Sequence, residues 1–402
     1  MFNPFELKAR LLIEGISLGR IDAGPWKERT EHLYQHDGGN GAVVNYPQEL
    51  VLSQGPSPEW DTVVNIRHNP ASPWRVGSTG QGRFALTHAD GSSLDVSAVD
   101  RPEFYKRTLS TGAATSSVVQ HLGRDALGVI PNNHCSYFAA GDQCRFCEIE
   151  GTYKDRVAYP KMRKSVDVIV EGISLAAALS DARHLILTAG NLRKNDSTAS
   201  IYCDILEGLN DQCRPGLYRY GSIMAPETFA WIHRLAACGL NGVGFNLEFH
   251  NPDQFARLAP GKNAYGREKL LAALEESVSS FGAGNVFSNM VFGIQTWTSQ
   301  YPAVDFSHEV DCSLRATDDL LERGIIPLFT LYHSSGKNQI GPVALDLEAV
   351  LGFHREYARR THASKLVPDS RSGVLFNVGT IANHICSDAL AELRPAPTAL
   401  AS

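Results

Sequence analysis

The chain has 402 residues, of which 43% are hydrophobic, and it carries a formal net charge of −6 at pH 7. This length and apolar content suit one α/β domain of about 200 to 250 residues with appended elements, and they exclude a disordered protein. The negative charge and the lack of a clustered basic run argue against partners such as nucleic acid or an anionic membrane. With no secretory signal pattern and no run of about 18 apolar residues, we expect a cytoplasmic protein that acts on small molecules or peptides.

Residues 1–118 are predicted to form an N-terminal β-rich region. Short β-type runs at 41–44, 62–66, 83–86 and 94–96 alternate with turn residues such as those of HADGSS. This spacing is typical of a small antiparallel sheet. The pattern gives no function for the region, so a purely structural cap and a cover over a site both remain open.

Residues 119–345 change to a rhythm of strand followed by helix. Apolar runs lie at 126–130, 184–190, 220–224, 242–248, 285–294 and 325–331, and helical segments are expected near 165–180, 197–210, 226–238, 264–281 and 313–323. Buried runs separated by helices indicate a parallel sheet. The fold class is therefore predicted as α/β, with a partial (βα)6 TIM-like barrel. Residues 346–402 are predicted as a C-terminal helix from Asp346 followed by an irregular, mobile tail.

Three cysteines lie within thirteen residues, directly after the first of these runs. They are Cys135, Cys144 and Cys147, in CSYFAAGDQCRFC. Three thiolates are one fewer than a closed zinc site or a fully ligated 4Fe-4S cluster requires. The cysteines alone therefore leave two interpretations open, a structural zinc site completed by His134 or a cluster with one open iron. The other five cysteines, at 203, 213, 238, 312 and 386, are expected to be buried, inert thiols.

Polar residues follow the later strands at the same predicted rim. Thr188 to Asn191 close the second run, Asn246 and Glu248 the fourth, and Gly293 and Gln295 the fifth. Met224 closes the third run, and Tyr332 and His333 close the sixth. Because ligands bind beyond the carboxyl ends of parallel strands, we expect these residues to converge with the cysteine loop.

With this arrangement residues 120–345 resemble the radical SAM enzyme superfamily, whose members carry a three-cysteine loop after the first strand of a partial (βα)6 barrel. The resemblance is carried by the cysteine loop, by LTAGN after the second strand, by FNLE on the fourth and by VFGIQ on the fifth. The spacing of eight residues between the first two cysteines differs from the commonest form of the family, which has three. This departure leaves the subfamily open.

The resemblance implies a role for each of these residues. Cys135, Cys144 and Cys147 are the cluster ligands and the catalytic centre, and the cluster reductively cleaves S-adenosylmethionine (SAM) to a 5′-deoxyadenosyl radical that takes hydrogen from the substrate. The cofactors are thus a 4Fe-4S cluster and SAM, and the implied SAM-binding residues are Phe146, Thr188, Gly190, Asn191, Asn246, Glu248, Gly293, Ile294 and Gln295. In the family, the aromatic lies beside the adenine, the element after the second strand holds the amino group, a polar group on the fourth strand binds the ribose, and the element on the fifth packs on the adenine.

Each role has a structural alternative. Phe146 is equally suited to plain hydrophobic packing, residues 188–191 to a tight turn, and residues 293–295 to any buried strand. Glu248 alternatively forms a salt bridge with Arg257 or Lys262. His250 and His333 are candidate substrate contacts, and 259–266 is expected to be a solvated loop, with anion binding at the start of the next helix as the other interpretation.

The predicted function is that of a radical SAM enzyme of unknown net reaction, supplied by an electron donor such as flavodoxin or ferredoxin. One alternative is a zinc-stabilised α/β binding protein, and another is a SAM-binding enzyme with nonradical transfer chemistry.

Overall fold

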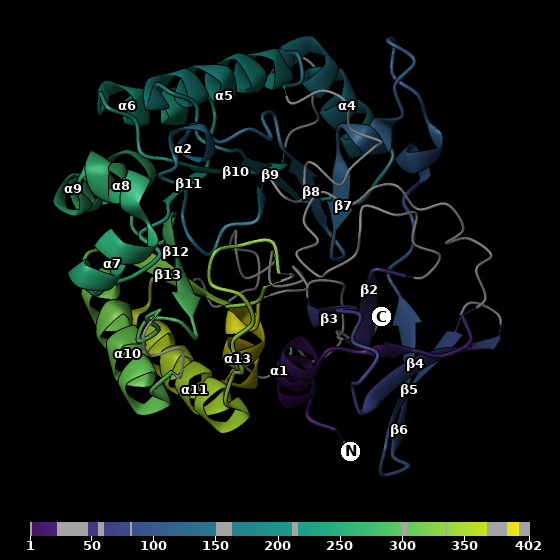
Figure 1. Cartoon of the computed structure of the whole chain (residues 1–402). Coiled ribbons are helices and arrows are strands. Elements are labelled where there is room, and N and C mark those ends of the chain that lie inside the picture. The colour runs from purple at the N-terminus through teal and green to yellow at the C-terminus, as the bar shows by residue number, and fades with distance from the viewer. Residues whose placement is uncertain are drawn as a thin grey trace.

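The computed structural model describes residues 2–21, 47–54, 60–80, 83–149, 163–210, 216–299, 304–334, 336–367 and 384–393. These residues contain two β-sheets (Figure 1). The first is formed by strands near the N-terminus, and the second is formed by strands from the rest of the chain. The predicted run at 41–44 and the expected mobile end at 394–402 lie outside the described residues. None of the helices in this part of the chain has the length and apolar character needed to cross a membrane.

The N-terminal sheet has six strands in the order β1-β4-β5-β6-β2-β3. Their bounds are β1 Ser17–Leu18, β2 Glu49–Ser53, β3 Thr62–Asn65, β4 Trp74–Gly80, β5 Arg83–His88 and β6 Ser93–Ala98. All neighbours pair antiparallel except β1 and β4, which are parallel. The antiparallel β unit expected from the turn-rich sequence is therefore present. The sequence analysis did not predict α1 (Pro4–Glu14), which begins at the Asn3 cap and ends at Gly15.

The second sheet has seven strands in the order β13-β12-β11-β10-β9-β8-β7. Its strands are β7 Gln120–Leu122, β8 Ala126–Val129, β9 His184–Thr188, β10 Tyr218–Ile223, β11 Gly242–Phe245, β12 Val286–Phe292 and β13 Ile325–Leu331. Strands β8 to β13 are all parallel and lie in chain order, whereas β7 pairs antiparallel with β8. The six strands expected from the apolar runs are all observed. Because β8 to β13 run parallel, their six carboxyl ends lie at one edge of the sheet.

Helices lie along the outer side of the curved parallel sheet (Figure 1). They are α4 Val166–Ala178, α5 Asn195–Asn210, α6 Ala230–Ala237, α7 Pro252–Leu258, α8 Pro260–Tyr265, α9 Arg267–Phe281, α10 Phe306–Glu322 and α11 Leu347–Ser364. The short helix α2 Ser136–Ala140 lies in the cysteine loop, and α13 Cys386–Leu393 packs on α11. Short 3-10 helices at Glu103–Lys106 and Thr115–Ser117 connect the two sheets. Apolar side chains of both sheets and of α1, α11 and α13 form one continuous core.

Three predicted helices have clearly different bounds in the structure. The helix expected near 313–323 is α10, which begins at Phe306 after the Asp305 cap. The segment at 264–281 is divided between α8 and α9, because the chain turns at Gly266 with a φ of 106° that favours glycine. Helix α6 begins at Ala230 instead of Pro226, because the backbone N–H groups of Glu227 and Thr228 donate to the carboxylate of Asp196. Residues 259–266 were expected to be a solvated loop, and that was wrong, since they contain α8.

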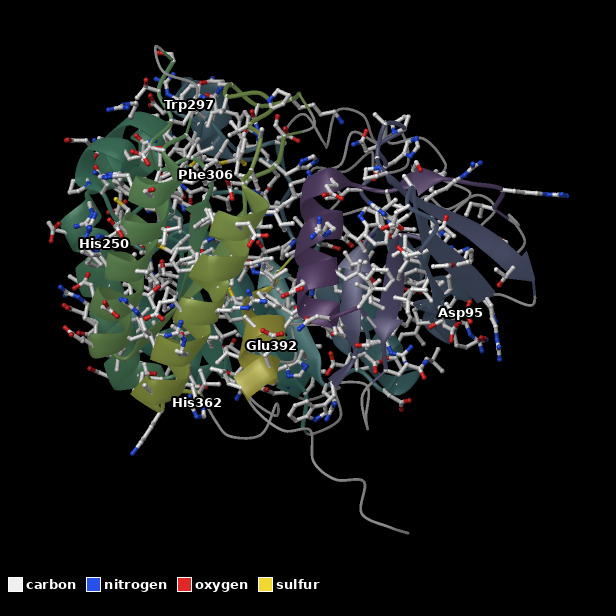
Figure 2. The ribbon with its side chains drawn as sticks, turned by 90° about the horizontal axis from the view of Figure 1, so that it is seen from below. Asp95, His250, Trp297, Phe306, His362 and Glu392 are labelled. Carbon is white, nitrogen blue, oxygen red and sulfur yellow. The ribbon has the colours of Figure 1, made fainter. Side chains whose placement is uncertain are left out.

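The C-terminal helices α11 and α13 pack against α1, and both views show the three side by side (Figures 1 and 2). Residues 386–393, expected within the irregular tail, form the buried helix α13 instead. The ammonium of Lys8 on α1 is 2.8 Å from the carboxylate of Asp388 on α13, and both side chains are almost fully buried. This ion pair joins the two ends of the described chain.

The end of β9 approaches the start of the cysteine loop closely. The backbone N–H of Gly190 donates to the carbonyl of Asn132 (3.0 Å), and the N–H of Ser136 donates to the carbonyl of Asn191 (2.7 Å). A Cβ atom on Gly190 would overlap the carbonyl oxygen of His134 and lie 2.6 Å from its carbonyl carbon. Only glycine therefore allows β9 to support the cysteine loop at this distance.

We predict that Lys8→Ala lowers the free energy of unfolding by about 3–5 kcal/mol, because it leaves a buried carboxylate without its cation. The double variant Lys8→Met/Asp388→Leu should recover most of this loss, since it removes both charges. Urea denaturation measures both. The exposed pair Arg10–Glu14 on α1 is the control, for which Arg10→Ala should cost only about 0.3–0.5 kcal/mol. An equal loss in the single and double variants would contradict the role of the ion pair.

We also predict that Gly190→Ala destabilises the protein by about 1–3 kcal/mol, because the added methyl group forces the cysteine loop away from β9. Gly352→Ala on α11 is the matched control, since a Cβ there meets no atom within 4 Å. That variant should gain about 0.5–1 kcal/mol from its helical position. Urea denaturation of the two variants should therefore give shifts of opposite sign, and unchanged stability of Gly190→Ala would refute the close contact.

Candidate functional site

A cavity of about 410 Å³ opens at the carboxyl ends of the parallel strands. This volume lies within the range of roughly 300–1,000 Å³ that is usual for small-molecule sites. Each of the six parallel strands contributes through its last residues or those that follow: Ile130, Thr188, Ser222, Ile223, Asn246, Asn289, Met290, Val291, Thr330 and Leu331. The predicted rim therefore exists as one shared cavity.

All three cysteines of the loop line this cavity. Cys135 lies at the N-cap of α2, Cys144 and Cys147 follow that helix, and each is partly buried. Burial raises the pKa of the Cys147 thiol to about 12 and raises that of Cys144 as well. Because metals bind the thiolate, iron or zinc would have to displace the protons of these thiols. Outside the loop, Cys203, Cys238, Cys312 and Cys386 are buried as expected, and Cys213 lies outside the described residues.

The three thiols were compared with the two metal centres that the sequence left open. No group of three His, Cys, Asp or Glu side chains within the described ranges is placed to hold one metal ion. A tetrahedral zinc needs every sulfur at about 2.3 Å from the same ion, whereas a 4Fe-4S cluster takes each thiolate on a different iron. His134, the candidate fourth zinc ligand, is not among the residues that line the cavity. Three thiols at one cavity are the number that would leave one iron of a 4Fe-4S cluster without a protein ligand.

Backbone contacts hold the cysteine loop on both sides. On one side, the residues after β13 cross it, where the N–H of Gln339 donates to the carbonyl of Arg145 (2.8 Å) and the amide of Asn338 donates to that of Phe146 (3.2 Å). On the other side, the N–H of Gly261 in α8 donates to the carbonyl of Asp142 (3.0 Å). These contacts use main-chain atoms of the loop, so its thiols remain directed to the cavity.

Three predicted residues after β9 lie together at the cavity. Thr188, Gly190 and Asn191 all line it, and the Asn191 side chain is fixed by a hydrogen bond from its amide to Asn195 (3.0 Å). The sequence left two interpretations of this segment open, a ligand site and a tight turn. The structure shows it supporting the cysteine loop and facing the cavity at once.

Glu248 and Asn246 also line the cavity, after β11. Lys262 of α8 lies 2.5 Å from the Glu248 carboxylate and donates to the carbonyl of Asn246 (2.8 Å), so the salt bridge considered as the alternative is present. Burial disfavours the Lys262 ammonium, but Glu248 and Cys144 outweigh burial and raise the pKa of Lys262. The pair occupies the same wall as the cysteines.

The backbone of Glu248 is left-handed, with a φ of 64°. That conformation costs a non-glycine residue roughly 1–2 kcal/mol. It is held on both sides by β12, where the N–H of Glu248 donates to the carbonyl of Asn289 and the N–H of Val291 donates to that of Glu248, both at 2.9 Å. Strain kept in this way is common at functional sites and supports a ligand role for this side chain.

Phe146 lines the cavity, and its ring also packs edge-on against Phe249 with centroids 5.5 Å apart. Gly293, Ile294 and Gln295, by contrast, are not among the residues that line it. After β12 the chain turns at Gly293, and the backbone N–H groups of Gly293 and Gln295 donate to the buried carboxylate of Glu309 (2.6 and 2.7 Å). The cavity instead meets β12 earlier, at Asn289, Met290 and Val291.

Of the two candidate histidines, only His333 lines the cavity. His250 lies on the outer side of the molecule, where its Nε2 is 3.2 Å from the carboxylate of Asp319 on α10 (Figure 2). Burial lowers the pKa of His250. The structure therefore separates His250 from the other candidate residues.

Sequence reasoning missed several polar residues of the cavity. Asn133 precedes the first cysteine, Asn289 lies in the middle of a strand, and Asn65 and Arg67 come from the N-terminal region. Asn133 and Asn289 could have been found from the sequence, because each is a polar residue within or beside an apolar run. Asn65 and Arg67 gave none, because only the packing of the two sheets brings them here.

Buried polar atoms at the cavity indicate that it binds a polar ligand. Within the described structure, Nδ2 of Asn133 and Oδ1 of Asn289 are buried without a hydrogen-bond partner. A buried polar group of this kind costs about 1–3 kcal/mol unless it is satisfied. A ligand with polar groups, such as SAM, would satisfy them.

The chain matches no family model. It is similar to bacteriochlorophyllide c C-7(1)-hydroxylase of Chlorobaculum limnaeum, with 23% identity over 239 residues, and the match spans only 56% of each chain. Among solved structures it is similar to the FeFe-hydrogenase maturase HydG of Carboxydothermus hydrogenoformans (14% identity, 68% of this chain and 58% of that one, TM-score 0.45). It is also similar to a radical SAM methyltransferase of Sphaerobacter thermophilus (15% identity, 72% and 76%, TM-score 0.41).

Neither TM-score reaches 0.5, so the fold assignment rests on the strands described above. The chain spans little more than half the length of the curated relative that it matches. The chain is thus similar to enzymes of the radical SAM superfamily in its cysteine loop, which follows the first of six parallel strands and lines the cavity at their carboxyl ends.

Proposed function

We propose that the protein binds a 4Fe-4S cluster through Cys135, Cys144 and Cys147 and uses it to cleave SAM reductively. The observation that carries this proposal is that the three thiols share one cavity with polar groups from the ends of the parallel strands. When bound, the cluster supplies the electron that splits SAM, and the resulting 5′-deoxyadenosyl radical removes hydrogen from a small-molecule or peptide substrate. The curved row of parallel strands would then be the partial (βα)6 TIM-like barrel, with residues 1–118 and 346–402 as its additions.

Different residues of the cavity would bind different parts of SAM. Thr188, Gly190 and Asn191 offer acceptors for its amino group, and Asn246 and Glu248 are placed for the ribose hydroxyls, which a carboxylate accepts well. Phe146 offers an aromatic face to the adenine. Gly293, Ile294 and Gln295 are left out of the proposed SAM site, because they lie outside the cavity lining.

The identity of the substrate is not carried over from the relative. The hydroxylase is named for a bacteriochlorophyllide, but it is 23% identical to this chain over little more than half of either length. The proposed activity is therefore reductive cleavage of SAM followed by hydrogen abstraction from a substrate. The proposed electron donor is a flavodoxin or a ferredoxin.

We predict that Cys144→Ala abolishes both cluster assembly and 5′-deoxyadenosine formation, because two thiolates of the loop do not retain the cluster. Anaerobic reconstitution, followed by iron and sulfide analysis and by product analysis with dithionite, measures both. Cys312→Ala, which removes a buried thiol outside the cavity, is the control and should keep its iron. A wild-type protein that holds one zinc and no sulfide would support the zinc alternative and refute the proposal. Cluster and SAM binding without 5′-deoxyadenosine would favour nonradical transfer.

We further predict that Glu248→Ala weakens SAM binding by about tenfold or more, because the ribose loses hydrogen bonds to a charged group. The variant also leaves Lys262 without its carboxylate, so Glu248→Ala/Lys262→Met should restore stability but not SAM affinity. Calorimetric titration of SAM, together with urea denaturation, separates the two effects. If the double variant bound SAM as tightly as the wild type, the carboxylate would serve only the salt bridge.

A further inference from the structure

Helices α7 and α8 contact the cysteine loop on both sides of Cys144. The N–H of Gly261 in α8 donates to the carbonyl of Asp142 (3.0 Å), and the N–H of Arg145 donates to the carbonyl of Leu258 at the end of α7 (2.8 Å). A Cβ atom on Gly261 would lie 2.8 Å from the carbonyl oxygen of Asp142, so glycine is needed for this close approach. The residue that follows Gly261 is therefore fixed near this cysteine.

That residue is Lys262, which lines the cavity together with Cys144 and Cys147. Its ammonium is 2.5 Å from the Glu248 carboxylate and donates to the carbonyl of Asn246 (2.8 Å). Only 12% of the Lys262 side chain and 9% of the Glu248 side chain are exposed. Two opposite charges are thus held almost out of water at the cavity that the cysteines also line.

The two charges of this ion pair act on the thiols with opposite sign. Burial is the largest cause of the raised pKa of the Cys144 thiol, Lys262 opposes it, and Glu248 adds to it with a smaller effect. Burial also raises the pKa of the Cys147 thiol to about 12, and there Glu248 acts more strongly than Lys262. The positive charge therefore has the stronger effect at Cys144, and the negative charge has the stronger effect at Cys147.

Stability alone gives no reason for an ammonium at position 262. A buried ion pair contributes little to stability, because the cost of taking both ions out of water offsets their attraction. The main-chain bonds of Gly261 and Arg145 already hold the two helices on the loop. A redox centre beside the ammonium, by contrast, would respond to its charge. A reduced cluster carries one more negative charge than an oxidised one, so a nearby cation favours the reduced state.

We infer that Lys262 raises the reduction potential of the cluster, with Glu248 as the opposing charge, so that the ion pair sets how readily the cluster accepts an electron. The inference rests on the proposed function, because it assigns a role toward the proposed cluster. In the step concerned, one electron passes from the donor protein to the oxidised cluster, and no bond forms or breaks. Lys262 acts through its charge and transfers no proton.

The test measures the reduction potential of the cluster in the full, anaerobically reconstituted chain without SAM. A potentiometric titration with dithionite, followed by the electron paramagnetic resonance signal of the reduced cluster, gives the midpoint. Lys262→Met, which keeps the apolar stem, should lower the ratio of reduced to oxidised cluster at a fixed potential by about tenfold, which is a shift of about −59 mV. Glu248→Gln, which keeps the shape of the side chain, should shift the midpoint in the positive direction.

A surface ion pair of the same composition provides the control. Lys106 and Glu103 are 2.7 Å apart, but 73% of the Lys106 side chain is exposed. Because water and salt screen exposed charges, Lys106→Met should change the ratio of reduced to oxidised cluster by less than about twofold. A shift as large as that of Lys262→Met would overturn the inference, since the midpoint would then follow the net charge of the protein.

A second comparison keeps the test decisive if Lys262→Met fails to fold with its buried carboxylate unpaired. The double variant Lys262→Met/Glu248→Gln removes both charges, and its ratio of reduced to oxidised cluster should be about tenfold lower than that of Glu248→Gln alone. An unchanged midpoint in that comparison would overturn the inference. So would shifts of the same sign in Lys262→Met and Glu248→Gln, because two opposite charges cannot act in the same direction.

The same preparations separate this inference from the proposed function. Wild-type protein that holds a cluster and forms 5′-deoxyadenosine, but whose midpoint does not respond to the loss of Lys262, would overturn the inference alone. Protein whose midpoint responds as expected but that forms no 5′-deoxyadenosine would overturn reductive SAM cleavage and leave the role of Lys262 standing. Protein that holds no cluster would overturn both.

Discussion

The site depends on main-chain hydrogen bonds that hold the cysteine loop from three directions. The end of β9 supports its beginning through Gly190 and Asn191, α8 supports its middle, and the residues after β13 cross its end. Because the loop is fixed through its backbone, the three thiols remain available to a metal centre. A loop held by its cysteines alone would have no defined shape before metal binding.

The same parallel sheet explains why distant residues meet. Strands in chain order bring six carboxyl ends to one edge, and the cavity forms there. The left-handed backbone of Glu248 and the buried Lys262 beside it show that the structure maintains strain and buried charge at this edge. Both features lower the stability of the protein, and the packing of the core does not need them. They are therefore consistent with a site that binds a ligand.

The sequence predicted the repeating part of the fold well, since apolar runs and intervening helices follow directly from hydrophobic periodicity. It also located Thr188, Asn191 and Glu248, because residues at strand ends share one edge. It was wrong for His250 and placed Gly293 to Gln295 too near the cavity, because the direction of the chain after a strand depends on tertiary contacts such as the one to Glu309. Arg67 and helix α13 were missed, because the packing of one region on another leaves no local pattern.

In the proposed site, one iron of a three-cysteine cluster is left open for SAM. Electron–nuclear double resonance on the reduced, reconstituted protein measures this directly, with SAM labelled by ¹⁵N in its amino group and by ¹⁷O in its carboxylate. If SAM binds the open iron, both labels should show hyperfine coupling to the cluster. A reduced cluster that shows no coupling to either label, with SAM bound in saturating amount, would contradict it.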